Sequence, residues 1–166
     1  MNIQNKKEPK LSIIISNNDK FPSDCNINKQ KVVKLIEKIT EEENQKIKNF
    51  NILLCGDEEI FSYNMKYLSH NYYTDIITFY YPEKGYIDAD VLISVDSVKR
   101  NSGKYKTGFE SELYRVIIHG ILHLCGYDDK KTKQKFLMRK KENEYLKLVM
   151  EKQKNINLKS KSLKRV

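Results

Sequence analysis

Two histidines four residues apart stand in the apolar segment HGILHLCGYDD, which begins at His119. If this segment is helical, His119 and His123 lie on one face about one turn apart, so both imidazoles can point at one metal ion. Gly126 can end the helix in the left-handed conformation and turn the chain back. The spacing HxxxH-xx-G-xx-D then favours Asp129 over Asp128 as a third ligand.

Three protein ligands leave one position of a tetrahedral zinc ion open to water, which is typical of a catalytic site. Such a metal lowers the pKa of its water and polarises a phosphoryl oxygen. The alternative is a pair of hydrogen-bonded histidines, but the apolar flanks would require other buried partners for them. Gly120 stands where zinc peptidases of the HExxH type carry a glutamate base, so proteolysis is not expected.

Hydrophobic periodicity indicates the elements that must position these residues. The sequence predicts strands at 11–16, 51–55, 75–81 and 90–95. It predicts helices at 29–46, 97–105, 109–125 and 131–152, and a further helix that begins with Asp57 as its cap. The helix at 109–125 is apolar on most sides and is therefore expected to be buried. We predict an α+β fold, in which a small mixed sheet of about four strands packs on this central helix, with further helices at its flanks.

The length of 166 residues favours one domain, which we place at residues 1–153. Five of the basic residues behind the net charge of +9 lie in residues 154–166, which we expect to be a disordered basic tail. A positive chain suits a polyanionic partner, although a lysine-rich tail can also serve solubility alone. The three cysteines are widely spaced, which predicts reduced thiols. No membrane segment or signal-peptide core is recognised, so a cytoplasmic location and no membrane contact are expected.

Several motifs together resemble the YbeY family of metal-dependent endoribonucleases. HGILHLCGYDD is similar to the family signature HGxLHLxGYDH, TDIITF at 74–79 to its strand TDVLSF, and ADVLIS at 89–94 to its strand GDIxIS; Asn64, Tyr67, Met138 and Glu142 fit the flanking helices. The resemblance covers about residues 64–146 and, with the strand-helix-strand start, most of the chain; the lysine-rich end lies outside it.

This resemblance implies a zinc-dependent nuclease for single-stranded RNA that matures the 3′ end of 16S ribosomal RNA and serves ribosome quality control. Its partners would be ribosomal RNA and the small ribosomal subunit with its proteins. His119 and His123 carry over as ligands of one Zn²⁺. The family's third histidine is Asp129 here, and a two-histidine-one-carboxylate set also suits other divalent metals such as iron, manganese or nickel.

A second departure is Leu68, which stands where the family commonly has an arginine. His70, Lys66 and Arg115 are the cationic residues that can take its place, and each can equally be an ordinary surface residue. The general acid and base are not fixed by the sequence; the candidates are Asp75, Glu112 and His70. Glu112 can also be a surface partner of Arg115, and Asp75 can instead have a structural role at the start of its strand. Exposed tyrosines can stack unpaired bases, or pack within the sheet; they are Tyr72, Tyr73, Tyr80, Tyr81, Tyr86 and Tyr105.

Other functions remain open at this point. A non-catalytic maturation factor that binds ribosomal RNA, with a structural metal, would need no acid or base. A hydrolase for another substrate would keep the metal chemistry but show no RNA preference. An iron(II) oxygenase is disfavoured, because its ligands usually come from separate strands of a barrel.

Overall fold

The computed structural model describes residues 10–15 and 28–163, and the side chains of residues 28–151. A four-stranded sheet has the order β1-β2-β4-β3. Its strands are β1 (Lys10–Ile15), β2 (Ile47–Cys55), β3 (Ile76–Tyr80) and β4 (Ile87–Ser94). β1 pairs with β2 and β2 with β4 in parallel, whereas β3 runs antiparallel to β4. The sheet is therefore mixed, and the predicted α+β class with about four strands is confirmed.

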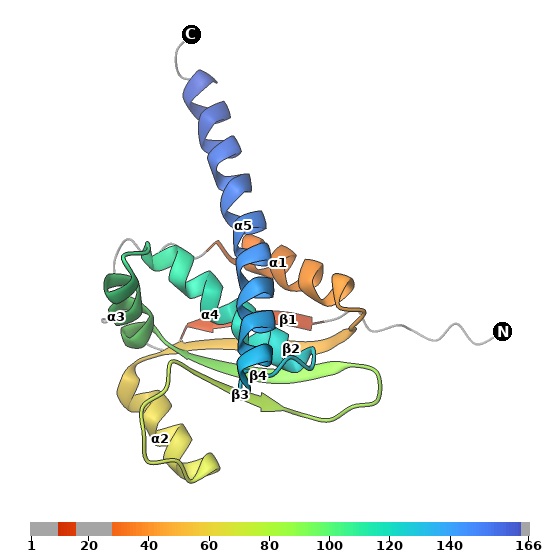
Figure 1. Ribbon diagram of the computed structural model, residues 1–166, viewed down its shortest axis with the longest axis vertical. Coiled ribbons are helices and arrows are strands. Elements are labelled where there is room, and N and C mark those ends of the chain that lie inside the picture. The colour runs from red at the N-terminus through yellow and green to blue at the C-terminus, as the bar shows by residue number, and fades with distance from the viewer. Residues whose placement is uncertain (1–9, 16–27, 164–166) are drawn as a thin grey trace, which may run out of the picture.

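Alternation along the strands gives the sheet two faces of unequal burial. One face, with Phe50, Ile52 and Leu54 of β2, joins the main hydrophobic core under α1 (Lys29–Glu42) and α4 (Phe109–Leu124). The opposite face carries a smaller cluster that packs against α2 (Asp57–Leu68). Figure 1 shows the same division, with α2 on one side of the sheet and α1, α4 and α5 on the other.

The central helix is α4, and its burial follows from its sequence. Apolar side chains on most of its sides are buried, including Leu113, Ile117 and Ile121. It contacts α3 (Val95–Tyr105), α5 (Thr132–Leu163), α1 and the strands β3 and β4. The predicted buried helix is thus confirmed, and its last two turns carry the two histidines.

The last helix differs from the prediction in length. α5 runs from Thr132 to Leu163, so it continues past the predicted end at Lys152 into the segment assigned to a basic tail. Figure 1 shows its distal half extending away from the other elements. The division of the chain into a domain at residues 1–153 and a disordered basic tail at 154–166 stays a prediction. Among the described helices, none is both long and apolar enough to span a membrane.

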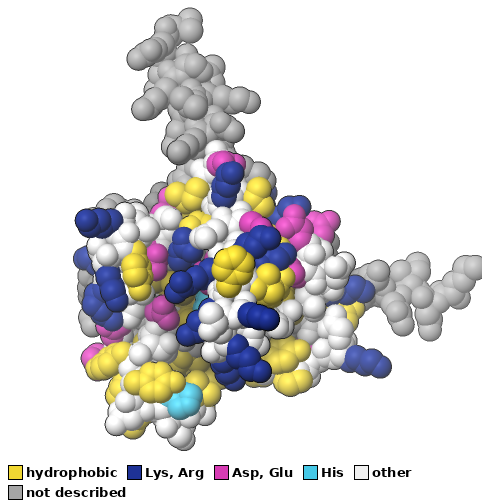
Figure 2. Space-filling view, viewed as in Figure 1, with side chains coloured by type: hydrophobic (Ala, Val, Ile, Leu, Met, Phe, Trp, Pro, Cys, Tyr) yellow, Lys and Arg dark blue, Asp and Glu magenta, His cyan; other side chains and the backbone are white. Residues whose placement is uncertain are grey.

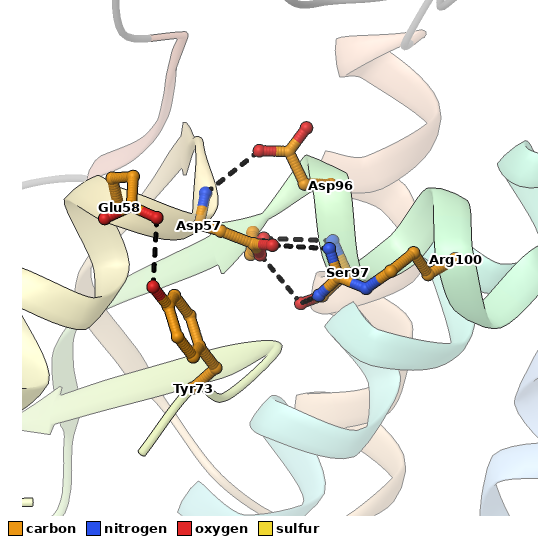
Figure 3. A network of polar contacts seen from close by, with 7 residues as sticks. Asp57, Glu58, Tyr73, Asp96, Ser97 and Arg100 are labelled. Atoms are coloured by element: carbon orange, nitrogen blue, oxygen red, sulfur yellow. Dashed lines mark hydrogen bonds and ion pairs between the residues drawn. The ribbon is translucent and has the colours of Figure 1, made fainter. Parts of the chain in front are cut away.

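The cap of α2 also differs from the prediction. Gly56, not Asp57, is the N-cap residue. The Asp57 carboxylate instead accepts hydrogen bonds from the hydroxyls of Ser94 and Ser97 and forms an ion pair with Arg100 (Figure 3). These contacts join the carboxyl ends of β2 and β4. Burial opposes ionisation of this carboxyl, but the hydrogen bonds from Arg100 and the two serines outweigh burial and lower its pKa.

We expect Asp57→Asn to lower the free energy of unfolding by about 1–3 kcal/mol at pH 7, because it leaves Arg100 without its charged partner. A lowered folded-state pKa stabilises the protein above the unfolded value of roughly 4, and this stabilisation is lost as the pH falls through the folded value. Urea unfolding of both proteins at pH 7 and pH 3 should therefore show the difference shrinking in acid. A difference of equal size at both pH values would contradict this account.

Candidate metal centre

Three side chains that the sequence singles out meet at the end of α4. His119, His123 and Asp129 each offer a ligand atom, and these atoms all lie within 4.8 Å of one another. All three side chains are half-buried. This group can hold one metal ion and leave a solvent-facing position. Their role as ligands stays a prediction.

The orientation of the imidazoles fits a cation between them. His123 Nδ1 lies 3.0 Å from the backbone carbonyl oxygen of Tyr127, which can only accept, so this nitrogen is the donor. His119 Nδ1 lies 2.7 Å from Glu142 Oε1 and donates to that carboxylate. In neutral rings both Nε2 atoms then carry bare lone pairs, and they face each other at 3.0 Å. Two facing lone pairs repel unless a proton or a metal ion lies between them, so the donor set suits a metal.

Glu142 is the strongest electrostatic partner of the site outside the three ligands. Its side chain is buried on α5 and reaches both His119 and, at 3.5 Å, the Arg115 guanidinium. Burial alone lowers the pKa of His119, but the hydrogen bond and charge of Glu142, with smaller contributions from Asp129 and Asp75, raise it overall. A carboxylate behind a ligating imidazole fixes the ring and makes its free nitrogen more basic.

Two features fix the loop that carries Asp129: a glycine with a positive φ and a cluster of hydrogen bonds around Glu43. Gly126 adopts a φ of +95°, which reverses the chain after α4 as the sequence predicts. Tyr127 then donates its hydroxyl to Glu43 at 2.8 Å, and Glu43 also accepts from Lys141 and Tyr145 of α5. Through Tyr127, whose carbonyl orients His123, this cluster connects the end of α1 to the metal site.

Asp128 takes a different role from its neighbour. Its Oδ1 accepts from the backbone N–H of Asp129 at 2.7 Å and of Lys130 at 3.3 Å, so the carboxylate caps the turn. This geometry agrees with the choice of Asp129 as the candidate third ligand.

Gly120 lies where α4 comes closest to β3. A Cβ built there would stand 2.6 Å from Ile76 Cδ1, which no packed structure tolerates without a shift. The position that carries the glutamate base in HExxH peptidases therefore faces the sheet here, and glycine permits the close approach.

The Gly120 contact gives a prediction that a second substitution can isolate. Gly120→Ala should lower the free energy of unfolding by at most about 1 kcal/mol, because the new methyl group meets only the terminal Cδ1 atom of Ile76, which can rotate, and the gain in helix propensity offsets part of that shift. Ile76→Val removes the Cδ1 atom that the new methyl group meets. In that background Gly120→Ala should become neutral or stabilising in urea unfolding. An equal cost in both backgrounds would show that the strain lies elsewhere.

The catalytic candidates lie at different distances from the ligands. Asp75 is half-buried just before β3, and its charge raises the pKa of both His119 and Glu112. Glu112 is buried two turns before His119, accepts from Thr107 Oγ1 at 3.4 Å, and has a pKa raised chiefly by burial. Glu112 is therefore not at the surface, although the charge of Arg115 does act on it and opposes the effect of burial on its pKa. His70 is exposed in the loop after α2, where its ring stacks on Tyr72.

The residues near the missing arginine can now be placed. Leu68 ends α2 and is 39% exposed, and Lys66 lies over the ring of Tyr67. Arg115 lies one turn before His119 on α4 and donates to Asn143 Oδ1 at 3.0 Å. Of the cationic candidates, Arg115 is thus tied to the ligand group through Glu142. The six tyrosines considered for stacking are all exposed, and their role stays a prediction.

Sequence reasoning did not assign a role to Glu142, nor did it find Glu43. A signal for Glu142 was present, since it falls on the same side of α5 as Met138 and Tyr145, which are buried. A carboxylate on an apolar helix face needs a partner, and His119 is that partner. Glu43 follows two other glutamates, and nothing in their order distinguishes it. Cys125, near the ligands, has its pKa raised to about 12 by burial, which agrees with a packed thiol.

Comparison with known proteins places this arrangement in a family. The family model described as Endoribonuclease YbeY matches residues 12–150. Endoribonuclease YbeY of Karelsulcia muelleri is 48% identical over 108 residues, covering 65% of this chain and 77% of that protein. Endoribonuclease YbeY of Azobacteroides pseudotrichonymphae is 44% identical over 127 residues, covering 76% and 89%. The solution structure of TM1509 from Thermotoga maritima, 26% identical, covers 87% of this chain and 92% of that one with a TM-score of 0.56.

Fold and site together define an α+β protein with a group of two histidines and a carboxylate, suited to a metal, at the end of a buried helix. The matched span and the identities show more: the chain belongs to the YbeY family. The resemblance drawn from the motifs is therefore confirmed.

Proposed function

We propose that the protein is a metal-dependent endoribonuclease that cleaves single-stranded ribosomal RNA. Membership of the Endoribonuclease YbeY family supports RNA cleavage. The single observation that carries the site is the pair of Nε2 atoms, 3.0 Å apart, whose rings are oriented by Glu142 and the Tyr127 carbonyl. His119, His123 and Asp129 would hold one zinc ion, although the carboxylate also suits iron or manganese.

The chemistry is phosphodiester hydrolysis. When bound, the metal would supply an activated water and polarise a non-bridging phosphate oxygen. Asp75, whose charge acts on His119, is the preferred proton acceptor of the three candidates. Glu112, whose pKa is raised by burial, lies two turns before His119 on α4 and is the candidate for a proton donor. His70, in the exposed loop after α2, remains a third candidate.

The biological setting follows from the family resemblance. The substrate would be the 3′ end of 16S ribosomal RNA, reached on or near the small ribosomal subunit in the cytoplasm. Quality control of defective ribosomes would use the same activity. The net charge of +9 suits this polyanionic partner.

The test is cleavage of a single-stranded ribosomal RNA fragment by the zinc-loaded protein, with the same fragment annealed to its complement as the control. We expect cleavage of the single strand only, and none with His119→Ala. An unstructured DNA strand of the same sequence should remain intact if the 2′-hydroxyl is recognised. Equal products from wild type and His119→Ala would contradict the proposal.

The same experiment addresses the non-catalytic alternative. A maturation factor with a structural metal would bind the fragment, lose its fold on metal removal, and leave the RNA intact. The exposed Leu68, in place of an arginine, is the feature that favours this alternative.

A further inference from the structure

Basic side chains crowd the part of α5 that follows the metal loop. Residues 130–141 read KKTKQKFLMRKK, with seven basic residues and no acidic one. Six of them are exposed, namely Lys130, Lys131, Lys133, Lys135, Arg139 and Lys140. The run begins directly after Asp129. Figure 2 shows Lys and Arg side chains gathered in the middle of the face that the N-terminal part of α5 crosses.

Helical spacing aligns part of this run with the candidate metal site. Lys135, Arg139 and Asn143 recur every four residues, so they form one line on α5. Asn143 accepts from Arg115 of α4 at 3.0 Å, one turn from His119. Lys135 and Arg139 therefore precede, on α5, the residue that contacts α4 one turn from His119, and Lys135 follows Asp129 by only six residues.

The metal site itself carries too many carboxylates to attract RNA strongly, so an approaching RNA needs positive charge nearby. Asp128, Asp129 and Glu142 surround the histidines, and Asp75 adds a further carboxylate nearby. These carboxylates together offset the charge of a divalent cation, so the centre offers a polyanion little net attraction. Within the described part of the chain, neither Lys135 nor Arg139 forms an ion pair with a carboxylate, so both positive charges can act on a polyanion.

An exposed aromatic ring stands beside the line. Phe136 is 73% exposed, more than any other large hydrophobic side chain in the described part of the chain. It lies next to Lys135 and one turn before Lys140. A bare aromatic ring among cations is the combination that holds single-stranded nucleic acids, since every base can stack on it.

We infer that Lys135, Arg139 and Phe136 form a docking surface for single-stranded RNA, on which backbone phosphates bind the two cations and an unpaired base stacks on the ring. This inference deepens the proposed function and rests on it. An anionic membrane also attracts basic helices, but the apolar side of α5, with Met138, Tyr145 and Val149, is already buried in the protein. RNA therefore fits this surface better than a lipid layer.

The test compares matched variants of the zinc-loaded full chain. Lys135→Gln/Arg139→Gln removes two charges from the surface, while Lys99→Gln/Lys104→Gln removes two exposed charges from α3 as the control. Binding of a fluorescent single-stranded RNA is measured by anisotropy from 50 to 300 mM salt. We expect the first variant to bind roughly 10-fold more weakly and its salt slope to fall by about 1.4, with the control unchanged.

Phe136→Ala should weaken binding roughly 5-fold or more without changing the salt slope, because stacking releases no counterions. Urea unfolding of each variant shows whether the fold is intact. Equal losses in the surface and control variants would overturn the inference, as would unchanged RNA binding with weakened binding to phosphatidylserine vesicles. RNA cleavage is followed in parallel: no cleavage by wild type contradicts the proposed function, whereas cleavage with unaltered binding in the surface variants contradicts only this inference.

Discussion

His123→Ala and Asp129→Ala are each expected to lose the bound metal and RNA cleavage together. Each substitution leaves only two of the three grouped ligand atoms, and two ligands do not hold zinc in a tetrahedral site. The loss of affinity should exceed the 10–100-fold that removal of an outer partner costs. Metal content after dialysis, measured by elemental mass spectrometry, and cleavage of single-stranded RNA are the two readouts.

Asp128→Asn is the matched control for Asp129→Ala. The asparagine oxygen can still accept from the backbone N–H groups of Asp129 and Lys130, so the turn should keep its shape. We expect this control to retain one metal ion per chain and to cleave RNA. Loss of metal in Asp128→Asn with retention in Asp129→Ala would reverse the assignment of the third ligand. Retention of metal in both His123→Ala and Asp129→Ala would rule out the site.

The regular parts of the molecule were accessible from the sequence because they repeat a simple pattern. β4 alternates buried side chains toward the main core, and α4 is apolar on most sides, so period and composition predicted both. The boundaries were less accurate: β2 begins at Ile47 rather than Asn51. The first residues of β2 include Lys48 and Asn49, whose side chains bond to Glu83 and Asp88, residues that are distant in sequence. Polar residues paired across strands carry no local signal.

The candidate site was accessible to the extent that its parts are close in sequence. His119, His123, Gly126 and Asp129 fall within eleven residues, so helical geometry for the histidines and a glycine turn for Asp129 were enough to predict that they meet. Glu43 contributes from far away, and only the packing of α1 against α5 shows that it receives three donors. Asp57 was predicted to be an N-cap residue from its position alone. Its carboxylate instead bonds to Ser94, Ser97 and Arg100, which are distant in sequence.

Glu142→Gln is the second substitution for which we expect a large effect, and it should separate metal affinity from stability. The glutamine keeps the size of the side chain and can still accept from His119 Nδ1, but it removes the negative charge behind the ring. Outer partners of this kind are worth about 10–100-fold in metal affinity. A buried neutral amide costs less to desolvate than a carboxylate, but Arg115 then lacks its charged partner; these two effects oppose each other, so the unfolding free energy of the metal-free protein should change little.

The pH dependence should change in a direction that a purely structural role would not produce. Glu142 raises the pKa of His119, so in wild type a proton competes with the metal up to a higher pH than on an ordinary histidine. Without that charge, competition should end at a lower pH, and the midpoint of metal binding should move down even as affinity at neutral pH falls. Glu144→Gln, an equal charge change at an exposed position two residues along α5, should alter neither quantity. A midpoint that stays fixed in Glu142→Gln, or moves as far in Glu144→Gln, would mean that the carboxylate only packs beside His119 and does not set its basicity.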